Sequence, residues 1–66
     1  MDKNTIKQNA EKVIKAMKVG YQYTLKGLQE LTTIGSTELF LALLVLIQEK
    51  KVEQYLSDNG VRYVLK

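Results

Sequence analysis

The side chains that could do chemistry in this chain are few in kind. Its 66 residues include no histidine and no cysteine, so the commonest general base, the commonest metal ligand and any thiolate zinc site are missing. Gly27, Gly35 and Gly60 each stand alone, and none belongs to a phosphate-binding loop. The acidic residues form no paired constellation. We therefore expect no enzyme, no cofactor and no metal site.

Lysine is the residue type whose placement is most suggestive. Half of the ten cations lie in the first segment of the chain, at Lys3, Lys7, Lys12, Lys15 and Lys18. Clustered lysines on one helix can follow the phosphate backbone of a nucleic acid. The simpler interpretation is a solvated helix face with Lys7–Glu11–Lys15 spacing. The candidate phosphate contacts are Lys7, Lys12, Lys15, Lys18 and, near the other end of the chain, Arg62.

A second candidate surface lies in the most apolar stretch of the sequence. Nine apolar residues run from Leu39 to Ile47, which is too few to span a bilayer, since that needs about 20. We expect a helix over 36–51, with Ser36 as its N-cap and Glu38 near the positive end of the helix dipole. Lys50 and Lys51 would then lie near the negative end of the same helix.

Helical spacing divides this stretch into two sides. One side carries Leu39, Leu43, Leu46 and Ile47, flanked by Phe40 and Ala42, and is expected in the core. The other side carries Thr37, Leu41, Leu44, Val45 and Gln48. A small domain cannot easily cover both sides of one helix. We expect this second side to bind another copy of the chain or a different protein, unless the hairpin or the N-terminal segment covers it.

The elements that position these surfaces follow from the periodicity of the remaining chain. Apolar residues at helical spacing predict a first helix over 4–18, with Gly20 as its stop. An aromatic stretch at 21–25 predicts a short strand. A short helix over 26–33 follows, with Thr24 as a candidate cap and Leu28 and Leu31 pointing inward.

The C-terminal part changes to a strand pattern. Two apolar-rich runs, 52–56 and 61–65, flank a segment containing Asn59-Gly60, which is a strong hairpin signal because Asn-Gly favours a type I′ turn. A two-residue Asn59-Gly60 turn places Leu56 opposite Tyr63, and Tyr55 opposite Val64. One face of this hairpin, directed at the core, would then hold Val52, Leu56, Tyr63 and Leu65.

The order helix, short strand, helix, turn, helix, hairpin is that of a winged helix-turn-helix domain. We therefore expect one α+β domain over 1–66, with three helices and a small antiparallel sheet that ends in a C-terminal β-hairpin wing. The third strand of the sheet would come from 23–25.

The chain also resembles a known family along nearly its whole length. The positions that carry the resemblance are Ile6, Asn9-Ala10, Lys12-Val13, Leu28, Leu31, Leu39-Phe40, Ala42-Leu43, Leu46, Glu49 and Lys51-Val52. They resemble the short, stand-alone winged helix-turn-helix proteins of bacteria and archaea that are classed as a domain of unknown function. The resemblance implies a small fold of DNA-binding type. It implies no catalytic or binding residues.

The sequence departs from the usual way in which this fold docks on DNA. The second helix of a helix-turn-helix motif normally enters the major groove with polar and basic side chains. Here only Thr37 and Gln48 could bond to a base, and the wing tip carries Asp58. We expect a homodimer formed through this apolar helix, with a role in DNA-associated or transcriptional regulation and weak, non-specific DNA contact. The alternative is a protein-interaction module that binds no nucleic acid.

The remaining expectations concern location and ligands. The polar N-terminus lacks the apolar core of a signal peptide, which predicts a cytoplasmic protein. The net charge of +3 permits contact with nucleic acid or an acidic partner without requiring it. No membrane association and no small-molecule ligand are expected.

Overall fold

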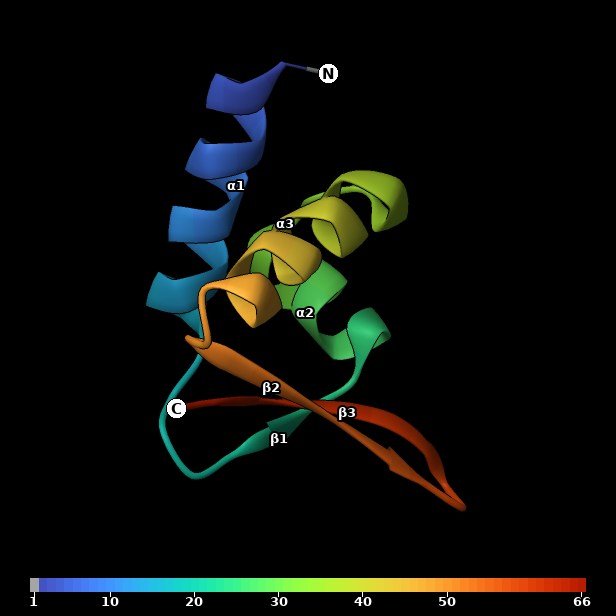
Figure 1. Cartoon of the computed structure of the whole chain (residues 1–66). Helices are drawn as coiled ribbons and strands as arrows, with labels where there is room; N and C mark the ends of the chain where they lie inside the picture. Colours follow the sequence, from blue (N-terminus) through green and yellow to red (C-terminus); the bar gives the residue numbers. More distant parts are fainter. Residues whose placement is uncertain (1) are drawn as a thin grey trace.

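The chain folds into three helices and one small sheet (Figure 1), described here for residues 2–66 of a computed structural model. In chain order the elements are α1 (Lys3–Ala16), β1 (Gln22–Tyr23), α2 (Leu25–Thr32), α3 (Ser36–Gln48), β2 (Val52–Ser57) and β3 (Gly60–Leu65). The α2 and α3 helices meet at 106°, within the range typical of a helix-turn-helix motif. The predicted α+β winged helix-turn-helix fold is confirmed.

The helices begin where local side chains or glycine allow the first turn to form. The N–H of Thr5 donates to Asp2 Oδ1 at the start of α1 over 2.8 Å. At the start of α2 the N–H of Gly27 donates to Thr24 Oγ1 over 2.9 Å, which confirms the predicted cap. The prediction for Ser36 is wrong: Gly35 is the N-cap of α3, Ser36 is its first helical residue, and no side chain caps this end.

The first helix ends slightly earlier than its apolar periodicity predicts. It stops at Ala16, and Met17 leaves the helix in an extended conformation while its side chain stays buried. Gly20, predicted as the stop, instead lies in the turn that leads to β1, where its φ of +90° suits glycine.

Within residues 2–66 no single helix is both long and apolar enough to cross a membrane. Only α2 and α3 taken together have the length and composition of a span, and the chain bends by 106° between them.

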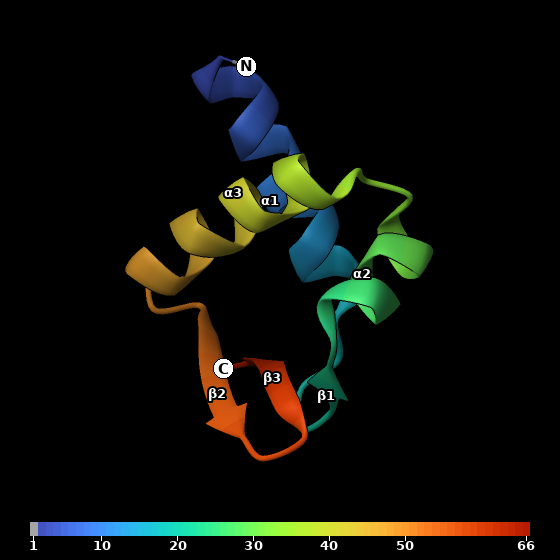
Figure 2. The same cartoon turned by 90° about the vertical axis from the view of Figure 1, so that its right-hand side faces the viewer.

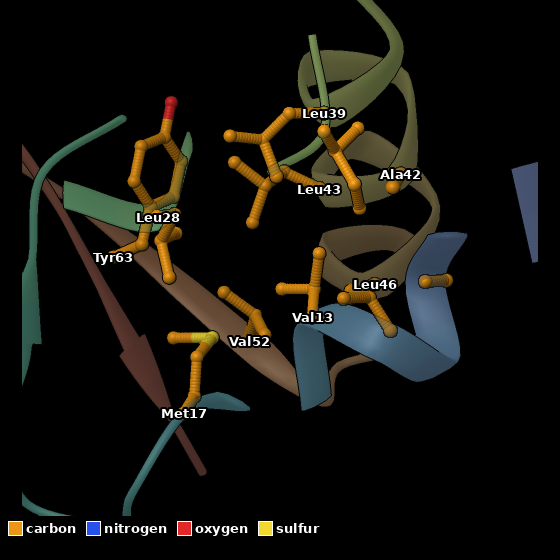
Figure 3. Close-up of a cluster of buried hydrophobic side chains, with 11 residues drawn as sticks. Val13, Met17, Leu28, Leu39, Ala42, Leu43, Leu46, Val52 and Tyr63 are labelled. Atoms are coloured by element: carbon orange, nitrogen blue, oxygen red, sulfur yellow. The ribbon is translucent and has the colours of Figure 1, made fainter. Parts of the chain in front are cut away.

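One core joins all three helices to the sheet (Figure 3). Its largest fully buried side chains are Val13, Leu28, Leu39, Leu43, Leu46 and Val52. Ala42 and Leu46 lie on the side of α3 near Val13 of α1, while Leu39 and Leu43 lie nearer Tyr63 (Figure 3). The core side of α3 therefore packs on α1 along one edge and on α2 and the sheet along the other.

Two side chains expected inside the core lie outside it. Leu31 of α2 is 57% exposed, although Leu28 on the preceding turn is fully buried. Phe40 of α3 is 45% exposed, although Leu39 beside it is fully buried. Both are edge positions on helices that bury only a narrow stripe. Helical spacing indicates which side of a helix is apolar, but not how wide a strip the neighbouring elements cover.

The sheet forms a separate layer against one end of the helices (Figure 2). Its strand order is β1-β3-β2, with both pairs antiparallel. The predicted third strand exists, but it is Gln22–Tyr23, because Leu25 already begins α2. Val52 and Tyr63 are buried and Leu65 is half-buried on the face toward the core, as expected.

The register of the hairpin differs from the prediction by two residues. Leu56 pairs with Val61, Tyr55 with Arg62, and Tyr63 with Gln54, so the predicted Leu56–Tyr63 and Tyr55–Val64 pairs are wrong. The turn residues are Asp58 and Asn59. Neither has a positive φ, whereas Gly60 has a φ of +109°. A two-residue slip leaves every side chain on its original face, so hydrophobic alternation cannot distinguish the two registers.

The contrast between Leu28 and Leu31 gives a direct test of the core. We expect Leu28→Ala to lower the free energy of unfolding by about 2–5 kcal/mol, because it leaves a cavity in a packed interior. Leu31→Ala, the matched control on the same helix, should cost less than about 1 kcal/mol. Urea unfolding at one low protein concentration measures both values. Equal losses would contradict the placement of Leu31 outside the core.

Candidate interaction surfaces

The side of α3 that faces away from the core is apolar. Leu44 is 40% exposed, Phe40 joins it one turn earlier, and Leu41 is half-buried beside them. Thr37 and Gln48, at the two ends of the helix, are exposed. Four of the five residues predicted for this surface therefore lie on it, and Phe40 is an addition that sequence analysis had assigned to the core.

The fifth predicted residue, Val45, turns toward α1. It is half-buried and lines a shallow hollow of about 380 Å3 with Ile6 and Lys7 of α1 and Glu49 beyond α3. Part of its surface is thus covered within the chain by the N-terminal helix. The exposed large apolar side chains of α3 are Phe40 and Leu44, and together with the half-buried Leu41 we call them the outer α3 patch.

The electrostatics of α3 differ from those of a helix that reads DNA. No charged residue lies between Glu38 in its first turn and Glu49 just after its end. The only polar side chains along the outward side are Thr37 and Gln48. A helix that enters the major groove must approach two phosphate backbones, and this helix offers them no cation.

The predicted lysine cluster is divided around the axis of α1. Lys7 lies at the α1–α3 hollow, close to Glu11 and Glu49 along the same wall. Lys12 and Lys15 lie at another hollow, between α1 and α2, with Ala16, Leu31 and Thr32. Five helical positions separate Lys7 from Lys12, which is about 140° around the axis. The lysines therefore do not form one patch.

The lysines of the predicted cluster form no ion pair within residues 2–66. Among residues 2–66 the two ion pairs are Lys51–Glu49 at 3.5 Å and Lys66–Glu53 at 3.1 Å. Lys18 follows α1, and its backbone N–H donates to Tyr23 Oη over 2.8 Å, which ties the end of the helix to β1. Lys12 and Lys15, which share the α1–α2 hollow, and Lys18, just after α1, thus have no ion-pair partner within residues 2–66, and we call these three lysines the basic edge.

Arg62, the predicted phosphate contact in the wing, is already engaged by backbone carbonyls of the hairpin. Arg62 Nη1 donates to the carbonyls of Asn59 and Val61, over 3.3 and 3.1 Å, and so braces the turn. Asp58 occupies the tip. Close behind it Leu56, 79% exposed, pairs with Val61 on the face of the sheet that carries the core residues. The alternating pattern placed Leu56 on the correct face, but the hairpin extends beyond the helices that could cover it (Figure 1).

The opposite face of the wing carries a small polar network. Tyr55 Oη donates to Glu53 Oε2 over 2.5 Å, and Lys66 Nζ lies 3.1 Å from Glu53 Oε1. The hydrogen bond from Tyr55, followed by the contacts with Lys66, lowers the pKa of Glu53. The same hydrogen bond raises the pKa of Tyr55. The side chains of Glu53 and Tyr55 are therefore engaged with each other at the outer strand.

Comparison of the chain with protein-family models, with curated proteins and with solved structures gave no significant match. The surfaces described above are therefore interpreted from their own geometry and chemistry.

The polar network predicts a measurable titration. Tyr55→Phe should raise the pKa of Glu53 toward its usual range, because the largest cause of its lowering is removed. In the native chain this network stabilises the fold above the usual glutamate pKa, and the effect is lost as the pH falls through the lowered pKa. Carboxyl chemical shifts followed against pH measure the change. An unchanged pKa in Tyr55→Phe would show that Lys66 alone holds the carboxylate.

Proposed function

We propose that this chain is a winged helix-turn-helix module that works by self-association, with the outer α3 patch as the centre of the contact. The observation that carries the proposal is the absence of charge from Leu39 to Gln48 together with the exposure of Phe40 and Leu44. In a DNA-reading domain these positions would face base edges. Apolar side chains gathered on one exposed helix instead favour contact with a protein.

A second copy of the chain suits this patch because the patch is self-complementary. Phe40 and Leu44 are one turn apart. Two antiparallel α3 helices related by a two-fold axis would therefore place Phe40 of one copy against Leu44 of the other. Neither copy would bring a charge into the centre of the contact, because Glu38 and Glu49 lie near the two ends of the helix. Burial of these side chains provides the driving force, at about 25 cal/mol per Å2 of apolar surface before the cost of association.

Weak nucleic-acid binding is a second candidate function, favoured by the unpaired basic edge of Lys12, Lys15 and Lys18. Lys12 and Lys15 of this edge line the hollow between α1 and α2, which contains no residue of the outer α3 patch. Self-association and phosphate contact would thus use different surfaces. The role in DNA-associated regulation that the fold suggests would operate through this edge, without readout of bases by α3.

Self-association through α3 is tested by Leu44→Lys. The variant should stay folded, because Leu44 lies outside the core, and should be monomeric where the native chain is dimeric. Leu31→Lys is the matched control, since it places the same charge on another exposed leucine, at the α1–α2 hollow, which contains no residue of the patch. Sedimentation equilibrium at several concentrations measures both. A native chain that stays monomeric at roughly millimolar concentration, or a Leu44→Lys variant that remains dimeric, would contradict the proposal.

Nucleic-acid binding is tested by its salt dependence. Replacing Lys15 and Lys18 with Gln should weaken binding to duplexes of unrelated sequence by a similar factor. It should also reduce the slope of log affinity against log salt by about 1 to 2, because up to two phosphate contacts are lost. Thr37→Ala should change neither quantity. Tight binding to one sequence that is lost in Thr37→Ala would instead show that α3 reads bases.

A further inference from the structure

The hollow between α1 and α3 carries cations that the chain itself does not pair. Figures 1 and 2 both show the first turns of α1 projecting beyond α3, and these turns form one wall of the hollow. Its apolar lining is the half-buried pair Ile6 and Val45. Its charged lining residues are exposed, and they are Lys3 and Lys7 on α1 and Glu49 just beyond α3.

The charges of the hollow favour a carboxylate from outside the chain. Lys3 and Lys7 form no ion pair within residues 2–66. The carboxylate of Glu49, by contrast, is paired with Lys51 over 3.5 Å. The acid that belongs to the hollow is therefore already engaged, and two cations beside an apolar surface remain available to a partner.

Glu38 is the exposed acid that lies on the same side of α3 as this hollow. It precedes Val45 by seven residues, which brings it to within about 20° of Val45 around the helix axis. The same spacing places it about 10 Å from Val45 along the helix, toward the N-terminal end. Its side chain is exposed and forms no ion pair within residues 2–66. Glu38 is thus on the correct side to meet the hollow, but at the wrong end to reach the hollow of its own chain.

Two-fold symmetry removes this separation. When Phe40 of one copy lies against Leu44 of the other, the axis passes beside Ala42, midway between them. The partner's Glu38, four residues before the axis, is then level with Leu46, four residues after it. A two-fold axis that relates side-by-side antiparallel helices also keeps the same flank of both helices on one side. The partner's Glu38 therefore arrives on the α1 flank, within one turn of Val45.

We propose that in the dimer the partner's Glu38 occupies the α1–α3 hollow and pairs with Lys3 and Lys7. This proposal rests on the self-association proposed above, and it names the charges that orient the second copy. Symmetry repeats the contact, so the dimer holds one such site at each end of the paired α3 helices. The occupant is a second copy of this chain because its acid, its distance from the axis and its flank all match the hollow.

The hollow also extends the outer α3 patch. Val45 follows Leu41 by one turn, so the apolar surface continues from the patch through Val45 to Ile6 of α1. A specific interface buries about 1,000 Å2 or more, and a short helix face with three apolar side chains falls short of that. Including the α1 wall on both copies adds apolar area at the two ends of the contact.

The ion pairs select the antiparallel arrangement. In a parallel pair of α3 helices, Glu38 of each copy would lie at the opposite end of the contact from the partner's hollow. Lys3 and Lys7 would then keep their charges unpaired. Exposed ion pairs add little affinity, but charge complementarity across an interface determines orientation and suppresses the wrong partner. The test therefore measures partner choice as well as affinity.

The test is an exchange of charges between the two sides of the contact. Glu38→Lys alone, and Lys3→Glu with Lys7→Glu in one chain, each place like charges together at both symmetric sites. Each variant should raise the dissociation constant by roughly tenfold or more at low salt. A mixture of the two variants should form heterodimers in preference to either homodimer. One of the heterodimer's sites joins the two altered surfaces with their signs exchanged, and the other joins two native surfaces.

Glu30→Lys is the matched control for the exchange. Glu30 is an exposed glutamate on α2 and does not line the hollow. Its replacement should leave the dissociation constant unchanged, and the chain with Lys3→Glu and Lys7→Glu should not select it as a partner. Sedimentation equilibrium of the separate and mixed chains measures these quantities. The preference for the heterodimer should weaken as salt is added, because exposed charges are screened.

The native dimer gives an independent result that needs no variant. In a sample that mixes isotope-labelled and unlabelled chains, intermolecular nuclear Overhauser effects should join Glu38 of one copy to Ile6 and Lys7 of the other. A dimer without these contacts, or one in which Glu38→Lys changes neither affinity nor partner choice, overturns the proposal. If Leu44→Lys is still monomeric in that case, self-association through α3 stands without it. A native chain that is monomeric at roughly millimolar concentration overturns both.

Discussion

The burial of one side of α3 is the interaction on which the rest of the structure depends. Leu39, Leu43 and Leu46 are buried in the core shared with α1, α2 and the sheet, and α1, α2 and β2 pack directly against this helix. A chain of 66 residues has only enough elements to cover that one side. The apolar residues on the other side are therefore left at the surface, and the same constraint that forms the core also creates the patch.

Most of the fold could be predicted because each element carries its own local signal. Helical spacing identified the three helices, Thr24 marked the start of α2, and Asn59-Gly60 marked the hairpin. The predictions that failed were those that depend on neighbouring elements, namely the burial of individual side chains and the register of the hairpin. Leu31 and Phe40 sit at the edges of apolar stripes, and only the packing of adjacent helices decides whether an edge position is covered. The register failed because a two-residue slip preserves both faces of the hairpin.

The candidate surfaces were predictable to different degrees, because some depend on a single element and others on how several elements pack together. The outward side of α3 follows from angular position on a single helix, which the sequence encodes directly. The lysines of α1 are close in sequence, but the helix places Lys7 and Lys12 at different hollows. The strand order β1-β3-β2 had no sequence signal, because strand order is a property of the assembled sheet. The exposure of Leu56 was equally unpredictable, because Val52 on the same face of the hairpin is buried and the alternating pattern does not distinguish the two positions.

The position of β1 has a consequence for how the chain folds. Gln22 and Tyr23 pair only with Val64 and Tyr63, at the far end of the chain, and β1 makes no pairing with β2. The partner of β1 is the last strand in the chain, so β1 cannot pair until β3 is in place. This long loop closure costs entropy without an early reward, whereas the helices and the hairpin form from local contacts. We therefore expect the pairing of β1 with β3 to come late in folding, after the helices and the hairpin have formed.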